Sequence, residues 1–322
     1  MGLTTEPEGG LSYHELHRAG RSGWGWTLLG VLAFLLLILG LAPVVLVACF
    51  SVGYALAGDD VSAAVDRLSD TAHVTPAELA YINLGLAAAI PIAMGITWLV
   101  HGIHPRWLAS VRPRIRWRWL GLCLVLALAT LFVTIGVSAL VPAQGTDTDV
   151  GGHLNAFTDQ TRDFILVILF LTPLQAVGEE YAFRGYLTQA FGGLFGSRIA
   201  AVVIPAFLFA LAHGSQDVPV FFDRFAFGLV AGILVILTGG LEAGIAMHVL
   251  NNFLAFGLAL AYGDMSATLN VSEGSWWNIP VTLAQSLVYL GLVTWCARHR
   301  GIPTRTPTPV AGGDFVSGVP RL

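Results

Sequence analysis

The sequence predicts an all-α, polytopic integral membrane protein with about eight transmembrane helices. The first observation is composition, since 55% of the 322 residues are hydrophobic and only 11% are charged. The second is a mean hydropathy of +0.73, which is far from the balance of soluble chains. The third is that apolar residues gather in runs of about the 20 residues that a membrane-spanning helix needs. A water-soluble globule is therefore excluded.

Eight apolar windows are long enough to cross a bilayer or approach that length. They are residues 27–57, 79–101, 119–141, 164–183, 198–214, 220–239, 241–263 and 279–297, of which the fifth is short. The first window exceeds the apolar core of a signal peptide, so we expect an uncleaved span. A capping box of Thr75 and Glu78, with Pro76 at the first helical position, predicts where the second helix begins. Kinks are expected at the prolines inside windows, Pro43, Pro91, Pro173 and Pro205.

Charged residues in the loops predict the orientation. All 16 basic residues are arginines, and they cluster before the first window and after the second, fourth and eighth, whereas the alternate loops are acidic. Because basic loops stay on the cytoplasmic side, both termini are predicted to be cytoplasmic. We expect a cytoplasmic tail over residues 1–26, a transmembrane domain over 27–300 and a disordered tail over 301–322.

The charge and the cysteines limit the partners that the sequence allows. The formal net charge is −4, so no surface for nucleic acid is expected. The Arg-rich loop 106–118 is interleaved with tryptophans and is typical of a segment that touches anionic lipid headgroups. The three cysteines lie in apolar runs without metal-ligand spacing, so neither a disulfide nor a cysteine-based zinc site is expected. The sequence does not determine the oligomeric state.

Ionisable residues inside apolar runs are functional candidates, because a charge at the bilayer centre is costly. Glu180 and Arg184 are four residues apart and predict a supporting helical ion pair near the headgroup level. Glu179 points about 100° away from Glu180 on a helix, so it lies outside the predicted ion pair. A carboxylate that is not held in an ion pair is free to take and return protons. A solvated acid at a helix end is the alternative interpretation of Glu179.

Two later windows carry further polar residues. His213 closes the fifth window one turn after Phe209, and an interfacial histidine is its alternative interpretation. His248 and Asn252 lie one turn apart on one face of the seventh window. Two polar side chains at this depth predict a functional site, with an interhelical hydrogen bond as the alternative.

Other short patterns predict packing rather than chemistry. Gly228 and Gly232 form a small-xxx-small pattern, which permits close approach of two membrane helices. Asp223 and Arg224 are expected to pair with each other or to face water, and they are assigned no role. The chain contains no His-Glu-x-x-His, Gly-x-Ser-Gly or Gly-x-Gly-Asp motif, which disfavours three other kinds of intramembrane protease.

Taken in order, these motifs resemble those of the CPBP family, which comprises the type II CaaX prenyl proteases and the bacterial Abi proteins. The resemblance covers about residues 160–255. It implies an intramembrane endopeptidase that acts on a membrane protein or peptide in a lipid bilayer, here expected to be a bacterial plasma membrane. By position, it assigns water activation to Glu179 and His213. It assigns stabilisation of the tetrahedral oxyanion to His248 and Asn252.

The resemblance leaves the cofactor and the function class open. Glu179, His213 and His248 could hold a catalytic zinc ion with water in the fourth position, or the same residues could act without a metal. The acid and the histidines could instead form a proton or ion relay in a transporter. A non-catalytic membrane immunity or scaffold protein is the third alternative.

Straight helices would place Glu179 and His213 at different depths. Glu179 lies near the predicted cytoplasmic end of its window, whereas His213 lies near the opposite end of the next. Either Pro173 and Pro205 tilt or break these helices, or residues 187–197 dip into the bilayer and shift the next span.

Overall fold

The structure is a computed structural model that describes residues 10–68, 70, 72–142, 153–307 and 315–316. Within these residues the secondary structure is helical, and two isolated β-bridges join Ser12 to Arg305 and Ser110 to Gly240. In chain order the helices are η1 (Tyr13–Ala19), α1 (Trp24–Leu36), η2 (Leu37–Leu41), α2 (Ala42–Ala57), α3 (Val61–Arg67), α4 (Pro76–Ala87), α5 (Ala89–Leu99), η3 (Pro105–Leu108), α6 (Trp117–Ser138), α7 (Asp159–Phe170), α8 (Thr172–Glu179), η4 (Glu180–Leu187), α9 (Thr188–Phe195), α10 (Arg198–Ala212), α11 (Val218–Thr238), α12 (Glu242–Tyr262), α13 (Met265–Leu269) and α14 (Asn278–His299).

Seven helices of the described chain are long and apolar enough to cross a membrane, which makes this an integral membrane protein. They are Trp24–Ala57, Pro76–Leu99, Trp117–Ser138, Asp159–Phe195, Val218–Thr238, Glu242–Tyr262 and Asn278–His299. The all-helical membrane fold is confirmed, with seven helices of spanning length where about eight were predicted. The fifth window folds as the 15-residue helix α10. At 1.5 Å per residue it reaches about 22 Å, less than the hydrocarbon core of about 30 Å.

The fourth span is longer than the sequence suggests. The predicted window ended at residue 183, whereas α7, α8, η4 and α9 form one continuous apolar stretch, Asp159–Phe195. Pro173 lies in the first turn of α8, just after the irregular turn at Leu171, because its ring has no N–H to continue the helical ladder. The extension through α9 places Glu179 inside the span and not at its end.

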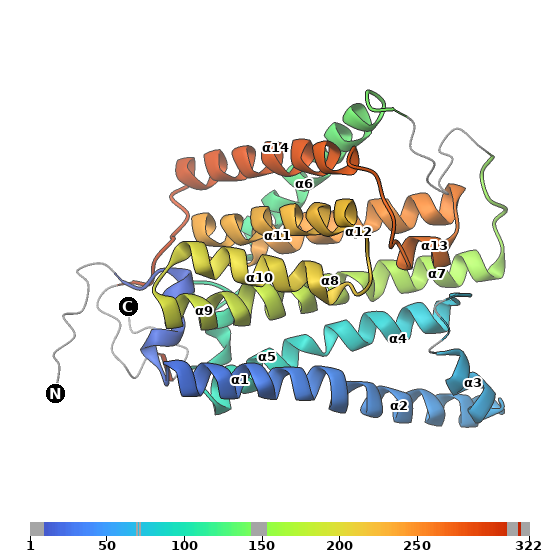
Figure 1. The fold of residues 1–322 in the computed structure, drawn as a ribbon, viewed down its shortest axis with the longest axis horizontal. Coiled ribbons are helices and arrows are strands. Elements are labelled where there is room, and N and C mark those ends of the chain that lie inside the picture. Colours follow the sequence, from blue (N-terminus) through green and yellow to red (C-terminus); the bar gives the residue numbers. More distant parts are fainter. Residues whose placement is uncertain (1–9, 69, 71, 143–152, 308–314, 317–322) are drawn as a thin grey trace.

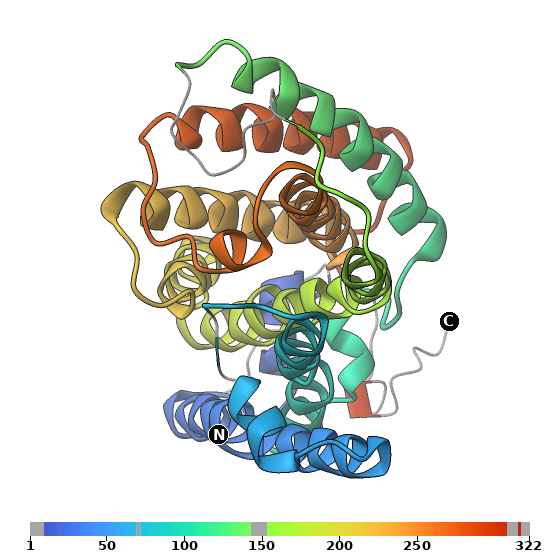
Figure 2. The same cartoon turned by 90° about the vertical axis from the view of Figure 1, so that its right-hand side faces the viewer.

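The long helices run side by side in layers (Figure 1). α1 and α2 form one edge, α14 and α6 form the other, and α8, α10 and α12 lie between them (Figures 1 and 2). α10 and α11 approach closely, because a Cβ at Gly228 would lie 3.0 Å from Cα of Ala206 and one at Gly232 would lie 3.0 Å from Cγ1 of Val202. This close approach is what the small-xxx-small pattern of both glycines predicts.

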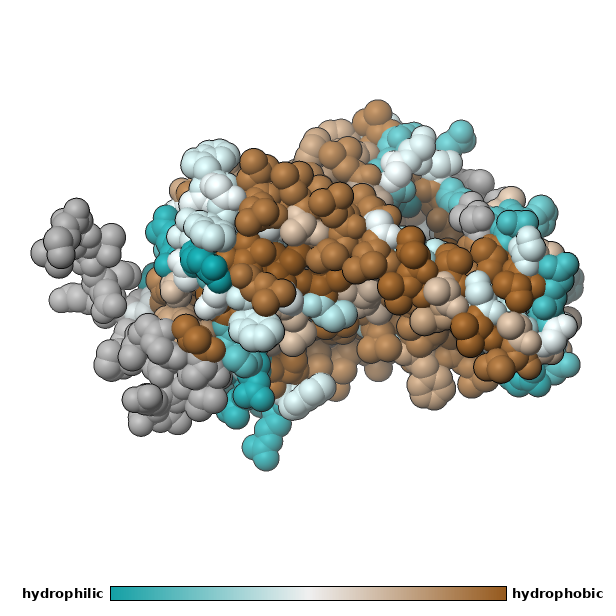
Figure 3. Space-filling model, turned by 90° about the horizontal axis from the view of Figure 1, so that it is seen from below, coloured by the Kyte–Doolittle hydropathy of each residue, from teal (hydrophilic) through white to brown (hydrophobic). Residues whose placement is uncertain are grey.

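The molecular surface matches a membrane environment. Figure 3 shows an apolar band across the middle of one face, with polar side chains towards its two ends. Large apolar side chains on the spans are exposed, such as Leu36, Leu39 and Phe132, each more than 70% accessible. Such a surface is suited to lipid, since soluble monomers rarely expose wide apolar patches.

The N-terminal segment is docked on the helix bundle. Residues Tyr13–Ala19 form η1, whose Tyr13 and Leu16 are buried. This segment packs on α9, where a Cβ at Gly192 would overlap the backbone of His14. The part of the predicted tail 1–26 that the structure describes is therefore attached to the membrane domain, and α1 already begins at Trp24.

The C-terminal segment differs from the predicted disordered tail over 301–322. Arg305 pairs with Ser12 in a β-bridge. Phe315 is buried, and its ring lies 4.8 Å from that of Trp107. The disorder prediction is wrong for these residues, because a buried apolar ring and paired backbone groups are both stabilising. Residues 308–314 and 317–322 of the predicted tail lie outside the described residues.

Candidate active site

Two adjacent glutamates and an arginine lie within the fourth span. Glu179 ends α8, and Glu180 and Arg184 belong to η4, a π-helical segment of a kind that often marks functional sites. Nη1 of Arg184 donates to Oε1 of Glu180 at 2.9 Å, which confirms the predicted ion pair. Both side chains are almost completely buried, with exposures of 1% and 0%. The pair therefore lies inside the bundle and not among lipid headgroups.

His248 of α12 contacts both glutamates. Its Nε2 lies 3.1 Å from Oε2 of Glu179, and its Nδ1 lies 3.0 Å from Oε1 of Glu180. Because an ionised carboxylate only accepts hydrogen bonds, both ring nitrogens donate when the two glutamates are ionised. Glu179, Glu180, Arg184 and His248, the glutamate–histidine cluster, then carry two negative and two positive charges. A neutral sum is what allows four charged groups to be buried together.

Small and aromatic residues enclose this cluster. Gly244 lies one turn before His248, and a Cβ there would lie 2.6 Å from Oε2 of Glu180. The guanidinium carbon of Arg184 lies 4.2 Å from the centre of the Phe209 ring, within cation–π range. The ring of Phe227 lies 5.3 Å from that of His248. The absence of a side chain at Gly244 is therefore needed for α12 to approach Glu180.

His213 reaches the same level as the cluster, which resolves the expected difference in depth. α9 and α10 form an antiparallel hairpin that turns at Gly196, whose φ is +63°. Glu179 precedes Gly196 by 17 residues and His213 follows it by 17, so equal helical lengths bring both back to one depth. Residues 187–197, which one of the two explanations expected to dip into the bilayer, instead continue the fourth span as helix up to the turn at Gly196, and this shifts the start of α10.

The orientation of His213 is set by its own helix. Its Nδ1 lies 2.8 Å from the carbonyl oxygen of Phe209, and since a carbonyl only accepts, Nδ1 is the donor. In the neutral ring the lone pair is then on Nε2. The rings of His213 and His248 lie 4.7 Å and 6.0 Å from that of Phe209. The direct hydrogen bond of Glu179 is with His248 and not with His213.

Amide side chains extend the site along α12. Nδ2 of Asn252 donates to Oε1 of Gln175 at 2.8 Å, which links α12 to α8. Asn251 accepts from Nε2 of Gln285 at 2.6 Å, and Gln285 accepts from Thr134 at 2.7 Å. The interhelical hydrogen bond that the sequence allowed for Asn252 is therefore present. It uses one of the two N–H groups of that amide.

Three of the four predicted catalytic residues line a cavity of about 180 Å³, and Glu179 lies behind His248 and not in its lining. His213, His248 and Asn252 line it, and its volume has room for several water molecules at about 30 Å³ each. The side chain of Glu179, at the edge of the cluster, retains 11% exposure, whereas that of Glu180 retains none. Glu179 is thus the carboxylate of the cluster that water can reach.

Sequence reasoning missed several residues of this cavity. Asp223 and Arg224 line it, although they were assigned no role, and so do Asn251 and Thr282. Nη1 of Arg224 donates to Gln216 at 2.6 Å. The feature of the sequence that could have indicated them is an acid and an arginine, Asp223 and Arg224, beside an apolar run. That signal could not show which helix face they occupy.

The residues predicted to hold a zinc ion are Glu179, His213 and His248. Within the residues that the structure describes, no group of three or more His, Cys, Asp or Glu is arranged to hold a metal ion. Nε2 of His213 has a lone pair suited to zinc, but both nitrogens of His248 face carboxylates. The predicted zinc ligands Glu179, His213 and His248 therefore do not fit a zinc site in this arrangement, and zinc stays a prediction.

Comparison with known proteins addresses the same region. A curated relative, an uncharacterized protein YyaK of Bacillus subtilis (strain 168), is 31% identical over 138 residues. That alignment covers 39% of this chain and 46% of the relative, so the match spans about half the length of the curated protein. No solved structure matches the chain. The family model that matches, over residues 161–254, is described as type II CAAX prenyl endopeptidase Rce1-like.

The matched region contains the whole candidate site apart from Thr134, Thr282 and Gln285. It runs from the first turn of α7 to residue 254 in α12 and includes the glutamate–histidine cluster, His213, Asn252 and the packing glycines. By this match, residues 161–254 are an Rce1-like domain of the type II CAAX prenyl endopeptidase (CPBP) family.

Proposed function

We propose that this protein is an intramembrane endopeptidase that hydrolyses a peptide bond of a membrane protein or peptide, in a bacterial plasma membrane. The observation that carries the proposal is the buried glutamate–histidine cluster at the edge of a cavity of about 180 Å³. Buried ionisable groups beside a polar cavity are suited to proton transfer. Membership of a family of endopeptidases supports the same class of reaction.

In the proposed reaction Glu179 is the general base. Its carboxylate accepts a proton from a water molecule in the cavity while the water oxygen attacks the peptide carbonyl carbon. Nε2 of His213 accepts the second hydrogen bond of that water and orients it. His248 holds Glu179 in place, because its Nε2 donates to Oε2. Glu179 then returns the proton to the leaving amine, so the general base is regenerated.

The negative charge of the tetrahedral intermediate needs hydrogen-bond donors. We assign this role to Asn252, whose second N–H group is not used by Gln175. His248, expected at the same place, contributes through its positive charge because both its nitrogens face carboxylates. Glu180 and Arg184 hold that imidazole in place through Oε1 of Glu180.

The experiment compares purified full-length protein with Glu179→Gln on a library of membrane peptides. Glutamine keeps the shape of the side chain but cannot act as a base, so cleavage should fall about 100-fold or more. Glu273→Gln, at an exposed loop acid, is the matched control and should cleave normally. Thermal unfolding of both variants shows whether each is folded.

Each remaining outcome decides an alternative. Full activity of folded Glu179→Gln contradicts the catalytic assignment. Ion flux in liposomes without any peptide cleavage would favour the transporter, and neither activity would favour a non-catalytic protein. Activity that survives exhaustive chelation, with no metal by elemental analysis, eliminates the zinc version of the mechanism.

A further inference from the structure

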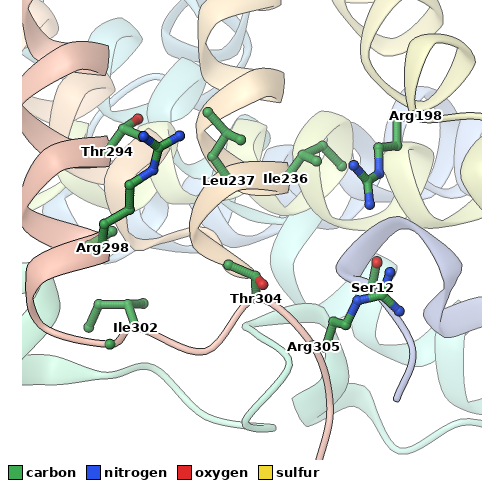
Figure 4. Close-up of a pocket in the computed structure, with 11 residues that line it drawn as sticks. Ser12, Arg198, Ile236, Leu237, Thr294, Arg298, Ile302, Thr304 and Arg305 are labelled. Carbon is green, nitrogen blue, oxygen red and sulfur yellow. The ribbon is translucent and has the colours of Figure 1, made fainter. Parts of the chain in front are cut away.

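A second cavity, of about 400 Å³, lies at the end of the bundle where α10 begins and α14 ends (Figure 4). Arg198, Arg298 and Arg305 line it from three different segments of the chain. Arg198 is the first residue of α10 and His213 follows its last, so the length of α10, about 22 Å, separates this cavity from the candidate active site. Binding at this cavity is therefore independent of the proposed peptidase activity.

Arg198 and Arg298 are hydrogen-bond donors of this arginine pocket that have no acidic counterpart among the described residues. No Asp or Glu of the described residues lines it. Arg198 and Arg298 form no ion pair with any described residue. Arg305 donates from Nη1 to the carbonyl oxygen of Gly10 at 2.9 Å, which holds its side chain at the pocket. Three guanidinium groups around one space favour an anion that can accept several hydrogen bonds.

Hydroxyl groups add to this donor set. Ser12, Thr294 and Thr304 line the same pocket (Figure 4). The Thr294 hydroxyl is buried and has no hydrogen-bond partner among the described residues. A buried hydroxyl normally has a partner, and an oxygen of a bound anion would supply it.

The apolar surroundings indicate what carries the anion. Ile236, Leu237 and Ile302 form part of the pocket wall. From there, exposed apolar side chains continue into the membrane at four-residue spacing on two packed helices: Leu237 and Ile233 on α11, and Ile199, Val203 and Phe207 on α10. Residues four apart share one helix face. A phosphate group joined to acyl chains would match both the arginine pocket and this apolar path.

We propose that the arginine pocket binds a phosphate group, with an anionic phospholipid headgroup as the ligand that presents it. Arg198, Arg298 and Arg305 contact the phosphate oxygens, and the Thr294 hydroxyl donates to one of them. Bound phosphate would join η1, the C-terminal segment and the ends of α10 and α14. The interaction is a salt-sensitive one, because guanidinium–phosphate contacts at an exposed rim are screened.

The test titrates the full-length protein in detergent with three probes: short-chain phosphatidylglycerol, the matching diacylglycerol, and inorganic phosphate. The Arg198→Gln/Arg298→Gln variant should bind phosphatidylglycerol about tenfold more weakly than the unaltered chain. Arg67→Gln/Arg162→Gln is the matched control, because it removes the same charge from two exposed side chains that lie outside both the pocket and the Arg-rich loop 106–118. It should change the affinity less than about threefold. Native mass spectrometry counts the bound lipid.

The arms separate the sources of the phosphate. Phosphatidylglycerol binding that inorganic phosphate does not displace identifies the lipid, and tight binding of inorganic phosphate with the same variant dependence identifies a free anion. Equal binding of phosphatidylglycerol by the pocket variant and the control variant overturns the proposal, as does equal binding of diacylglycerol. If the double variant does not fold, Thr294→Val tests the same contact, and unchanged affinity in it together with Arg198→Gln overturns the proposal.

Discussion

Replacing Gly244 by alanine tests the close approach of α12 to the glutamate–histidine cluster. The added Cβ would lie 2.6 Å from Oε2 of Glu180. That oxygen is buried and has no hydrogen-bond partner among the described residues. The methyl group therefore pushes directly against the carboxylate, and the other oxygen of the same group holds both Arg184 and His248.

The size of the effect follows from this distance. Reaching ordinary contact near 3.4 Å requires a shift of roughly 0.8 Å. A shift of that size stretches the contacts of Oε1, now 2.9 Å to Arg184 and 3.0 Å to His248, beyond normal hydrogen-bond length. Overpacking of this kind costs about 1–3 kcal/mol. Displacement of a residue that orients the base should also lower peptide cleavage about tenfold or more.

Gly257→Ala is the matched control, because Gly257 belongs to the same helix and a Cβ there meets nothing within 4 Å. Both variants gain helix propensity of about 1 kcal/mol, so the difference between them isolates the contact with Glu180. The assays are SDS-induced unfolding of the purified protein and cleavage of the membrane peptide that it cuts best. Equal stability and equal activity of the two variants would refute the proposed role of this contact.

Three further predictions follow from the same structure. Arg184→Gln should destabilise the protein by about 3–5 kcal/mol in SDS unfolding, because it removes one partner of a buried ion pair; a loss below about 1 kcal/mol would show that the pair is dispensable. Burial lowers the pKa of His17, and the neighbouring His101 ring lowers it further. Burial also lowers the pKa of His101, whose ring stacks on that of His17 with centroids 4.2 Å apart. Folding therefore favours the neutral rings, so their contribution to the free energy of unfolding is complete above the ordinary pKa of about 6.5 and is lost as the pH falls below it; hydrogen-exchange protection of η1, measured relative to the intrinsic exchange rate at each pH, that does not fall between pH 8 and pH 5 would contradict this. Gly192→Val should release η1, because its side chain would overlap the backbone of His14; limited proteolysis before α1 should become faster, and an unchanged rate would argue against docking.

Several features of the protein were determined by the sequence alone. Long apolar runs can satisfy their backbone groups in lipid only as helices, so the all-helical membrane fold followed from composition. The Glu180–Arg184 pair and the Gly228–Gly232 packing face followed from helical spacing, because both depend on residues within one helix. The start of α4 at Pro76 followed from its capping box, which is also local.

Other features needed contacts between distant segments. The contact of His248 with Glu179 and Glu180 joins helices 68 or more residues apart, and a helical period says nothing about the partner across an interface. The end of the fourth span was misplaced because the polar residues of η4, which mark the end of an apolar run, are stabilised in the interior by each other's charges. The sequence did not predict that Asp223 and Arg224 line the cavity, because their neighbours there come from α10 and α12.

The local pattern of a chain specifies which residues are polar and which turn they share, because those properties depend on a few neighbouring residues. Tertiary packing decides whether such residues meet, since the cost of burying a charge depends on the partner that another helix provides. In this protein the local pattern determines the helices, and tertiary packing determines the glutamate–histidine cluster and its cavity.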